Sequence, residues 1–191
     1  MTATTEETVR NGVDTAVMFG TLDAISGMPE LGRFQFRARN EWLGGAHNRS
    51  TIQGIAGAGQ EDTSAREAPF HFDAGEPPIL LGSNEGANPA EAYLHALAAC
   101  LTTSLVYVAA ARKVNLTRVE SVLEGDADLR GALGLSDEVR NGFDRIKVTF
   151  HIEGDAPPET LRELMDRARQ RSFVFDCVSG GVPVSIEVET P

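Results

Sequence analysis

The spacing of apolar residues along the chain predicts three helices and six strands. Helices are expected over residues 13–25, 89–114 and 157–168, where apolar side chains recur every three or four positions. Strands are expected over the following ranges, several with strict alternation of apolar and polar residues: 33–42, 49–56, 70–72, 118–124, 145–152 and 182–189. The strand at 33–42 has the pattern of a half-buried antiparallel strand, and the first ten residues are expected to be a loose tail. Clustered strands with separate helices indicate an α+β fold.

The segment 89–114 carries the clearest helix signal. Asn88 is expected to be the N-cap, Pro89 the first helical residue, and Glu91 the third. The residues that follow are apolar on nearly all sides, which is typical of a buried helix. At 1.5 Å per residue this helix is about 35 Å long, so we expect it to be the central helix of the fold.

The composition of the chain limits the classes of partner that it can bind and the cell compartment in which we expect it. The chain has 191 residues and a net charge of −11, which argues against binding to nucleic acid or to anionic lipid. We find no uncharged run of 18 apolar residues and no secretory signal, so no membrane span is expected and a cytoplasmic location is the default. Two distant cysteines and four scattered histidines predict neither a disulfide framework nor a metal site, and no motif calls for a cofactor.

Residues 1–32 are interpreted as an N-terminal extension with one helix, and residues 33–191 as the main domain.

Cys100 lies in the middle of the long helix and has two interpretations. It is either a small core residue, since free cysteine is often buried, or a redox-active thiolate. The middle of a helix gains nothing from that helix's own N-terminus, so a reactive thiolate here requires a side-chain cation. Arg49 is the candidate for this cation, reaching Cys100 across a dimer contact; the alternative is that Arg49 is a solvated strand residue.

The residues around Cys100 resemble a known family. The motif Asn88-Pro89-x-Glu91, followed by Leu94-x-Ala96-Leu97-Ala98-Ala99-Cys100, is similar to the motif of the OsmC/Ohr family, and further matches extend from about Phe34 to the C-terminus. The resemblance implies an α+β fold in an intertwined homodimer, with antiparallel sheets around two long cysteine-bearing helices. It also implies thiol-dependent reduction of organic hydroperoxides, a redox stress response, with Cys100 as the attacking cysteine.

The helper residues of the family are not at their expected positions. The family glutamate corresponds to Ala90 and the family arginine to Ala46, while Glu91 has the position of a helix cap. The resemblance places the resolving cysteine of the family at Ser172. Cys177, five residues further on, is either structural or a displaced resolving cysteine, and we predict no Cys100–Cys177 disulfide.

Three functions remain open from the sequence. The first is an enzyme that reduces organic hydroperoxides through Cys100 with an external thiol as reductant. The second is a non-catalytic OsmC-fold protein that binds a small apolar ligand or a partner at a pocket in the dimer interface, which Ala46 and Ala90 favour because they make a pocket more apolar. The third is a purely structural dimer.

Overall fold

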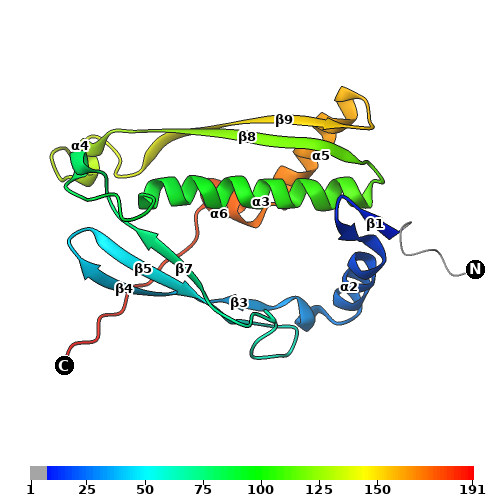
Figure 1. Cartoon of the computed structure of the whole chain (residues 1–191), viewed down its shortest axis with the longest axis horizontal. Coiled ribbons are helices and arrows are strands. Elements are labelled where there is room, and N and C mark those ends of the chain that lie inside the picture. The colour runs from blue at the N-terminus through cyan, green and yellow to red at the C-terminus, as the bar shows by residue number, and fades with distance from the viewer. Residues whose placement is uncertain (1–7) are drawn as a thin grey trace, which may run out of the picture. The chain divides into compact units, whose positions relative to one another are not determined.

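A computed structural model describes residues 8–191 of the chain (Figure 1). The described residues form two compact units. The C-terminal unit contains residues 8–13 and 94–191, and the N-terminal unit contains residues 14–93. The long helix α3 (Pro89–Ala111) has residues in both units.

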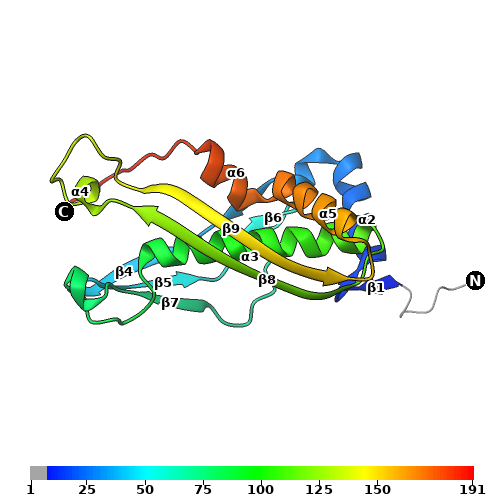
Figure 2. The ribbon, with the colours of Figure 1, turned by 90° about the horizontal axis from the view of Figure 1, so that it is seen from above.

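The C-terminal unit is built on a long antiparallel pair of strands. β8 (Leu116–Ala127) pairs with β9 (Phe143–Gly154), and Val119 lies opposite Ile152. Alternation then directs Val119, Ile152 and every second residue around them to one face of this two-stranded sheet. Figure 2 shows the pair of strands crossing over α3.

The core of this unit lies between the inner face of the sheet, α3 and α5 (Pro158–Arg171). Leu105 and Ala109 of α3 are completely buried, and they pack with Leu161 and Leu164 of α5. The buried residues of α3 recur at intervals of four, so they form one stripe. The expectation that α3 is buried on all sides is therefore wrong within one chain: Tyr93 and Tyr107 remain 44% and 52% exposed.

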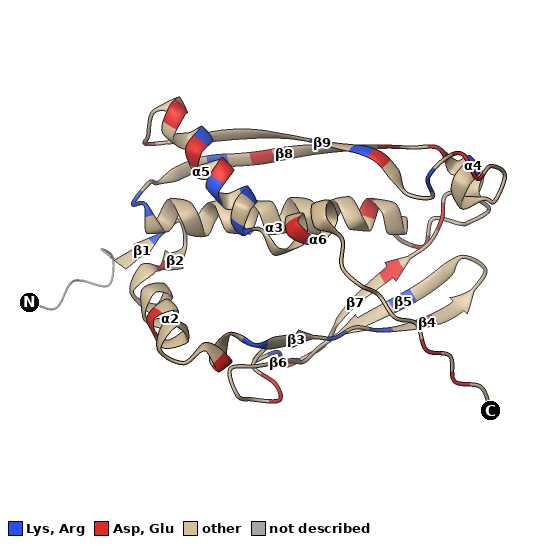
Figure 3. Cartoon of the chain, turned by 180° about the vertical axis from the view of Figure 1, so that it is seen from behind, with Lys and Arg blue, Asp and Glu red and all other residues tan. Residues whose placement is uncertain are grey.

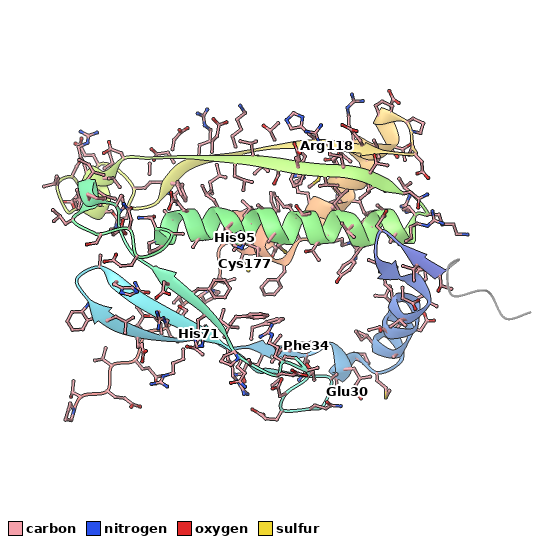
Figure 4. The ribbon with its side chains drawn as sticks, viewed as in Figure 1. Glu30, Phe34, His71, His95, Arg118 and Cys177 are labelled. Atoms are coloured by element: carbon pink, nitrogen blue, oxygen red, sulfur yellow. The ribbon has the colours of Figure 1, made fainter. Side chains whose placement is uncertain are left out.

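The outer face of the sheet is charged. Arg118 pairs with Glu153 across the strands at 3.3 Å, and Arg145 pairs with Asp126 at 2.6 Å. Figure 3 shows the basic and acidic residues along β8 and β9, and Figure 4 shows Arg118 pointing away from α3. One apolar and one charged face are what an antiparallel sheet with one side in water requires.

The N-terminal unit contains the helix α2, two short 3-10 helices and two small antiparallel sheets. Its elements are α2 (Thr15–Gly27), η1 (Pro29–Gly32), β3 (Phe34–Phe36), β4 (Arg39–Gly44), β5 (His47–Ile52), β6 (Ile55–Gly57), β7 (Phe70–Ala74) and η2 (Pro78–Leu80). β3 pairs with β6, and β5 lies between β4 and β7, all antiparallel. Asp14 caps α2 by accepting hydrogen bonds from the backbone N–H groups of Ala16 and Val17.

A short hairpin precedes α2 and includes Val9 and Arg10, the last two residues of the loose tail that we expected. β1 (Val9–Arg10) and β2 (Val13–Asp14) flank Asn11 and Gly12, which both have positive φ, at 52° and 78°. The side chain of Asn11 donates to the carbonyl of Val114 and accepts from the backbone of Leu116, both at 2.9 Å. The start of the described chain is thus fastened to the connection between α3 and β8. The first seven residues of the predicted tail lie outside the described residues.

Several predicted elements differ from the structure. The strand expected over 33–42 is divided into β3 and β4, and the strand expected over 49–56 is divided into β5 and β6. Phe34 and Phe36, which the pattern places on the apolar face of the expected strand, are 47% and 64% exposed. Residues 182–189 form no strand, because no neighbouring strand pairs with them. Two short helices, α4 (Leu129–Ala132) and α6 (Phe173–Gly180), were not predicted.

The expectation that no helix could cross a membrane does not follow from length and composition alone. Among the described residues, α3 is long and apolar enough to do so. A single helix of this kind is weak evidence for a membrane, because the core helix of a soluble protein passes the same test.

Candidate functional site

The sulfur of Cys100 lies where α5 ends and α6 begins. The hydroxyl of Ser172 donates a hydrogen bond to Cys100 Sγ at 3.2 Å, and the backbone N–H of Val174 donates to the same sulfur at 3.4 Å. Cys100 itself is partly buried on α3. Two donors from one segment of chain are therefore directed at one sulfur atom.

The position of Ser172 follows from its role in two helices. It is the C-cap of α5 and the N-cap of α6, with extended backbone (φ −77°, ψ 115°) that breaks the helix between them. Its hydroxyl oxygen accepts from the backbone N–H of Phe175 at 3.3 Å while its hydroxyl hydrogen is given to Cys100. Ser172 is 2% exposed and is the one buried polar side chain among residues 8–191. The buried hydroxyl therefore donates one hydrogen bond and accepts another, as is usual for buried polar groups.

This geometry corrects our expectation about the charge at Cys100. We expected only a side-chain cation to be able to act on a cysteine in the middle of a helix. In the structure a second helix, α6, directs its N-terminus at the sulfur, through the N–H of its second residue, Val174. The N-terminus of a helix carries a partial positive charge that favours anions. Sequence reasoning missed this contribution, although a serine followed by an apolar run is an ordinary signal for the start of a helix.

Ser172 also determines what the site can do chemically. The resemblance placed the resolving cysteine of the family at this residue, and the structure brings Ser172 against Cys100. A hydroxyl cannot form a disulfide, so this position cannot resolve an oxidised Cys100. Cys177 lies further along α6, and both cysteines are free thiols.

The start of α3 has the cap that the sequence predicts. The carboxylate of Glu91 accepts from the backbone N–H of Asn88 at 2.9 Å, and the side chain of Asn88 accepts from the N–H of Ala90 at 2.7 Å. This reciprocal pair is a capping box. Glu91 thus serves the helix end, as we favoured from its position.

Arg49 lies on β5 and is bound to a carboxylate of the neighbouring strand. Its Nε and Nη2 atoms donate to Asp73 on β7, at 3.0 and 3.2 Å, and Nε2 of His47 lies 2.8 Å from the same carboxylate. The hydrogen bond from Arg49, which has the larger effect, and the one from His47 both lower the pKa of Asp73. The hydrogen bond to Asp73 in turn raises the pKa of Arg49. The sequence did not point to Asp73 or His47, because their contact depends on strand pairing. That Arg49 acts on Cys100 stays a prediction.

No group of three or more His, Cys, Asp or Glu residues suited to a metal ion occurs within residues 8–191. His95, one turn and a half before Cys100 on α3, is exposed.

The geometry defines a class of protein: an α+β fold with antiparallel sheets and a long helix that carries one thiol in its middle. The family model described as OsmC-like protein matches residues 82–187, which contain both Cys100 and Ser172. The chain therefore belongs to the OsmC-like protein family. No curated protein sequence matches the chain.

Solved structures have the same fold at low sequence identity. An OsmC-like protein from Mycoplasma pneumoniae shares 14% identity over 76% of this chain and 88% of its own, with a TM-score of 0.56. An OsmC-like protein of unknown function from Vibrio cholerae shares 12% identity over 76% and 94%, also with a TM-score of 0.56. An organic hydroperoxide resistance protein from Legionella pneumophila shares 17% identity over 76% and 91%, with a TM-score of 0.50. The predicted α+β fold with a long helix bearing Cys100 is confirmed.

Proposed function

We propose that this protein reduces organic hydroperoxides through Cys100, with an external thiol as the reductant. The observation that carries the proposal is the environment of the sulfur, which receives hydrogen bonds from Ser172 and Val174 at the start of α6. Membership of the OsmC-like family supports it, as does the fold shared with a protein described as an organic hydroperoxide resistance protein.

In the first step the thiolate of Cys100 attacks the outer oxygen of the hydroperoxide ROOH. The O–O bond breaks, the alkoxide RO⁻ leaves and takes a proton from water to become the alcohol, and Cys100 becomes a sulfenic acid. The sulfur loses two electrons, and the peroxide gains them. The donors that now contact the sulfur are also placed to hold the new sulfenic oxygen.

In the second step a thiol from solution attacks the sulfenic sulfur. A mixed disulfide forms and water leaves; a second thiol then releases reduced Cys100 and a small disulfide. Ser172 carries a hydroxyl and no sulfur, so it cannot take the place of the first thiol and attack the sulfenic acid. The proposed cycle therefore uses one cysteine of the protein.

Replacing Cys100 by serine tests the proposal. The wild-type protein with an excess of dithiothreitol is expected to consume cumene hydroperoxide, and Cys100→Ser is expected to lose at least about 100-fold of that rate, because the attacking thiolate is gone. Cys177→Ser is the matched control and should keep the wild-type rate. Hydroperoxide consumption is followed directly. A wild-type rate no faster than buffer with thiol, or an unchanged rate in Cys100→Ser, would contradict the proposal.

A second candidate function is the binding of a small apolar ligand without catalysis. Two observations favour it: Ala46 and Ala90 stand where the resemblance expects charged helpers, and the N-terminal unit has an apolar hollow of about 390 Å³. The hollow is lined mainly by aliphatic and aromatic side chains of α2, η1 and β3, with Gly20, Ala24 and Ala58 leaving space. Alkylation of Cys100 at neutral pH discriminates between the two functions, since an inert thiol fits only the binding protein.

We further propose that the protein is a homodimer. Only one stripe of α3 is buried within the chain, and large apolar residues such as Tyr107 on α3 and Leu22 on α2 remain about half exposed, at 52% and 55%. Exposed apolar surface on this scale is typical of a protein interface. Light scattering at low micromolar concentration is expected to give twice the chain mass of 20.5 kDa, and a mass near 20.5 kDa would contradict the dimer.

A further inference from the structure

A hollow of about 300 Å³ lies between α5 and the C-terminal end of α3, and we call it the α3–α5 hollow. This end of α3 and the whole of α5 belong to the C-terminal unit, and Figures 1 and 2 show them alongside each other. The apolar part of the hollow is formed by Val108, Val114 and Leu164, and Leu164 is only 3% exposed. Val108 follows Cys100 on α3 at a distance of about 12 Å along the helix axis, so this hollow is separate from the thiol site.

Charged side chains surround the apolar part of the α3–α5 hollow. Arg112 lies directly after α3, Glu163 and Arg167 lie on α5, and Thr160 adds a hydroxyl. None of these three charged side chains forms an ion pair within residues 8–191, whereas two other arginines of α5 each lie 3.9 Å from a carboxylate of the same helix. Glu163 and Arg167 have a spacing at which helices commonly form ion pairs. Charges of both signs are therefore left available to a ligand.

We propose that the α3–α5 hollow binds a free apolar α-amino acid. A guanidinium holds a carboxylate through parallel N–H donors, so Arg112 and Arg167 suit the α-carboxylate. Glu163 suits the α-ammonium group, and the hydroxyl of Thr160 is a hydrogen-bond partner for either group. The side chain of the amino acid then covers the apolar part of the hollow and displaces water from it, which favours binding.

Charge and size argue against simpler ligands. A carboxylic acid without an amine would place a second carboxylate beside Glu163, at the end of α3 where the helix carries a partial negative charge. An amine without a carboxylate would leave both arginines without an anion. A volume of about 300 Å³ is at the lower limit of small-molecule sites, so a single amino acid fits better than a peptide or a nucleotide.

Calorimetric titration of the full chain with leucine and two analogues tests the proposal. 4-Methylpentanoate is leucine without the ammonium group, and 3-methylbutylamine is leucine without the carboxylate. Leucine is expected to bind with a dissociation constant below about 1 mM. Each analogue is expected to bind at least about tenfold more weakly, because it leaves charged side chains of the hollow without a partner.

Substitutions of the exposed charged residues assign the binding to this hollow. Arg112→Gln/Arg167→Gln is expected to weaken leucine binding at least about tenfold, because the carboxylate loses both guanidinium groups. Arg162→Gln is the matched control, since Arg162 also lies on α5 but does not line the hollow, and it should bind leucine as the wild-type protein does. Glu163→Gln is expected to weaken leucine binding and to strengthen the binding of 4-methylpentanoate.

Three outcomes would overturn the inference: no saturable binding of leucine up to about 10 mM, equal binding of leucine and 4-methylpentanoate, or an unchanged dissociation constant in Arg112→Gln/Arg167→Gln. The inference does not rest on the proposed hydroperoxide chemistry. Each variant of the hollow is expected to consume hydroperoxide at the wild-type rate when leucine is absent, because none of the substituted residues contacts Cys100.

Discussion

The variant Ser172→Cys is expected to form an intramolecular disulfide with Cys100 when it is treated with one equivalent of an organic hydroperoxide. The Ser172 oxygen is 3.2 Å from Cys100 Sγ, so a sulfur in its place needs only a small shift to reach the bond length of about 2.05 Å. The introduced thiol attacks the sulfenic acid of Cys100 and water leaves. Mass spectrometry under non-reducing conditions should show a near-complete loss of two hydrogens that joins the two peptides.

The wild-type protein provides the comparison for this experiment. With the same hydroperoxide it should gain one oxygen at Cys100 and form a mixed disulfide only when a thiol is added. Adding Cys177→Ser to Ser172→Cys should leave the new disulfide unchanged. A Cys100–Cys177 link in the wild-type protein would instead show that α6 supplies its own resolving cysteine and that the one-cysteine cycle is wrong.

Replacing Leu105 by alanine is expected to lower the free energy of unfolding by about 2–5 kcal/mol. Leu105 is completely buried between α3, α5 and the β8–β9 sheet, so the change leaves a cavity in the core of the C-terminal unit. Urea denaturation at one protein concentration measures the loss. Leu135→Ala is the matched control, because Leu135 is 71% exposed and its replacement should change the unfolding free energy by less than about 0.5 kcal/mol. Equal effects of the two substitutions would contradict the assigned core.

Elements that depend on neighbouring residues could be predicted from the sequence. The capping box of Asn88 and Glu91 acts within four residues, and the structure has it as predicted. β9 was expected over 145–152 and spans 143–154. It could be predicted because strict alternation of apolar and polar residues indicates a strand with one buried and one exposed face. The hairpin at Asn11-Gly12 was missed although its signal was present: an Asn-Gly dipeptide is typical of a two-residue turn with positive φ.

Elements that depend on distant residues or on a second chain could not be predicted in full. The division between β3 and β4 reflects different partners, since β3 pairs with β6 and β4 with β5. The segment 182–189 has the alternation of a strand, but a strand exists only where another strand accepts its hydrogen bonds. Its alternation therefore predicted a strand, but within the described chain the segment pairs with no other strand.

The sequence by itself determined the family motif, the long helix with Cys100 in its middle, and the absence of a cysteine at position 172. These follow from residue identity and from periods of two and 3.6 residues, which local geometry imposes. Only the tertiary structure decided what touches the sulfur. Ser172 and Val174 are more than 70 positions from Cys100 in the sequence, and they reach it because the break between α5 and α6 directs the start of α6 at α3. No local pattern encodes such a contact, because it depends on how separately formed helices pack.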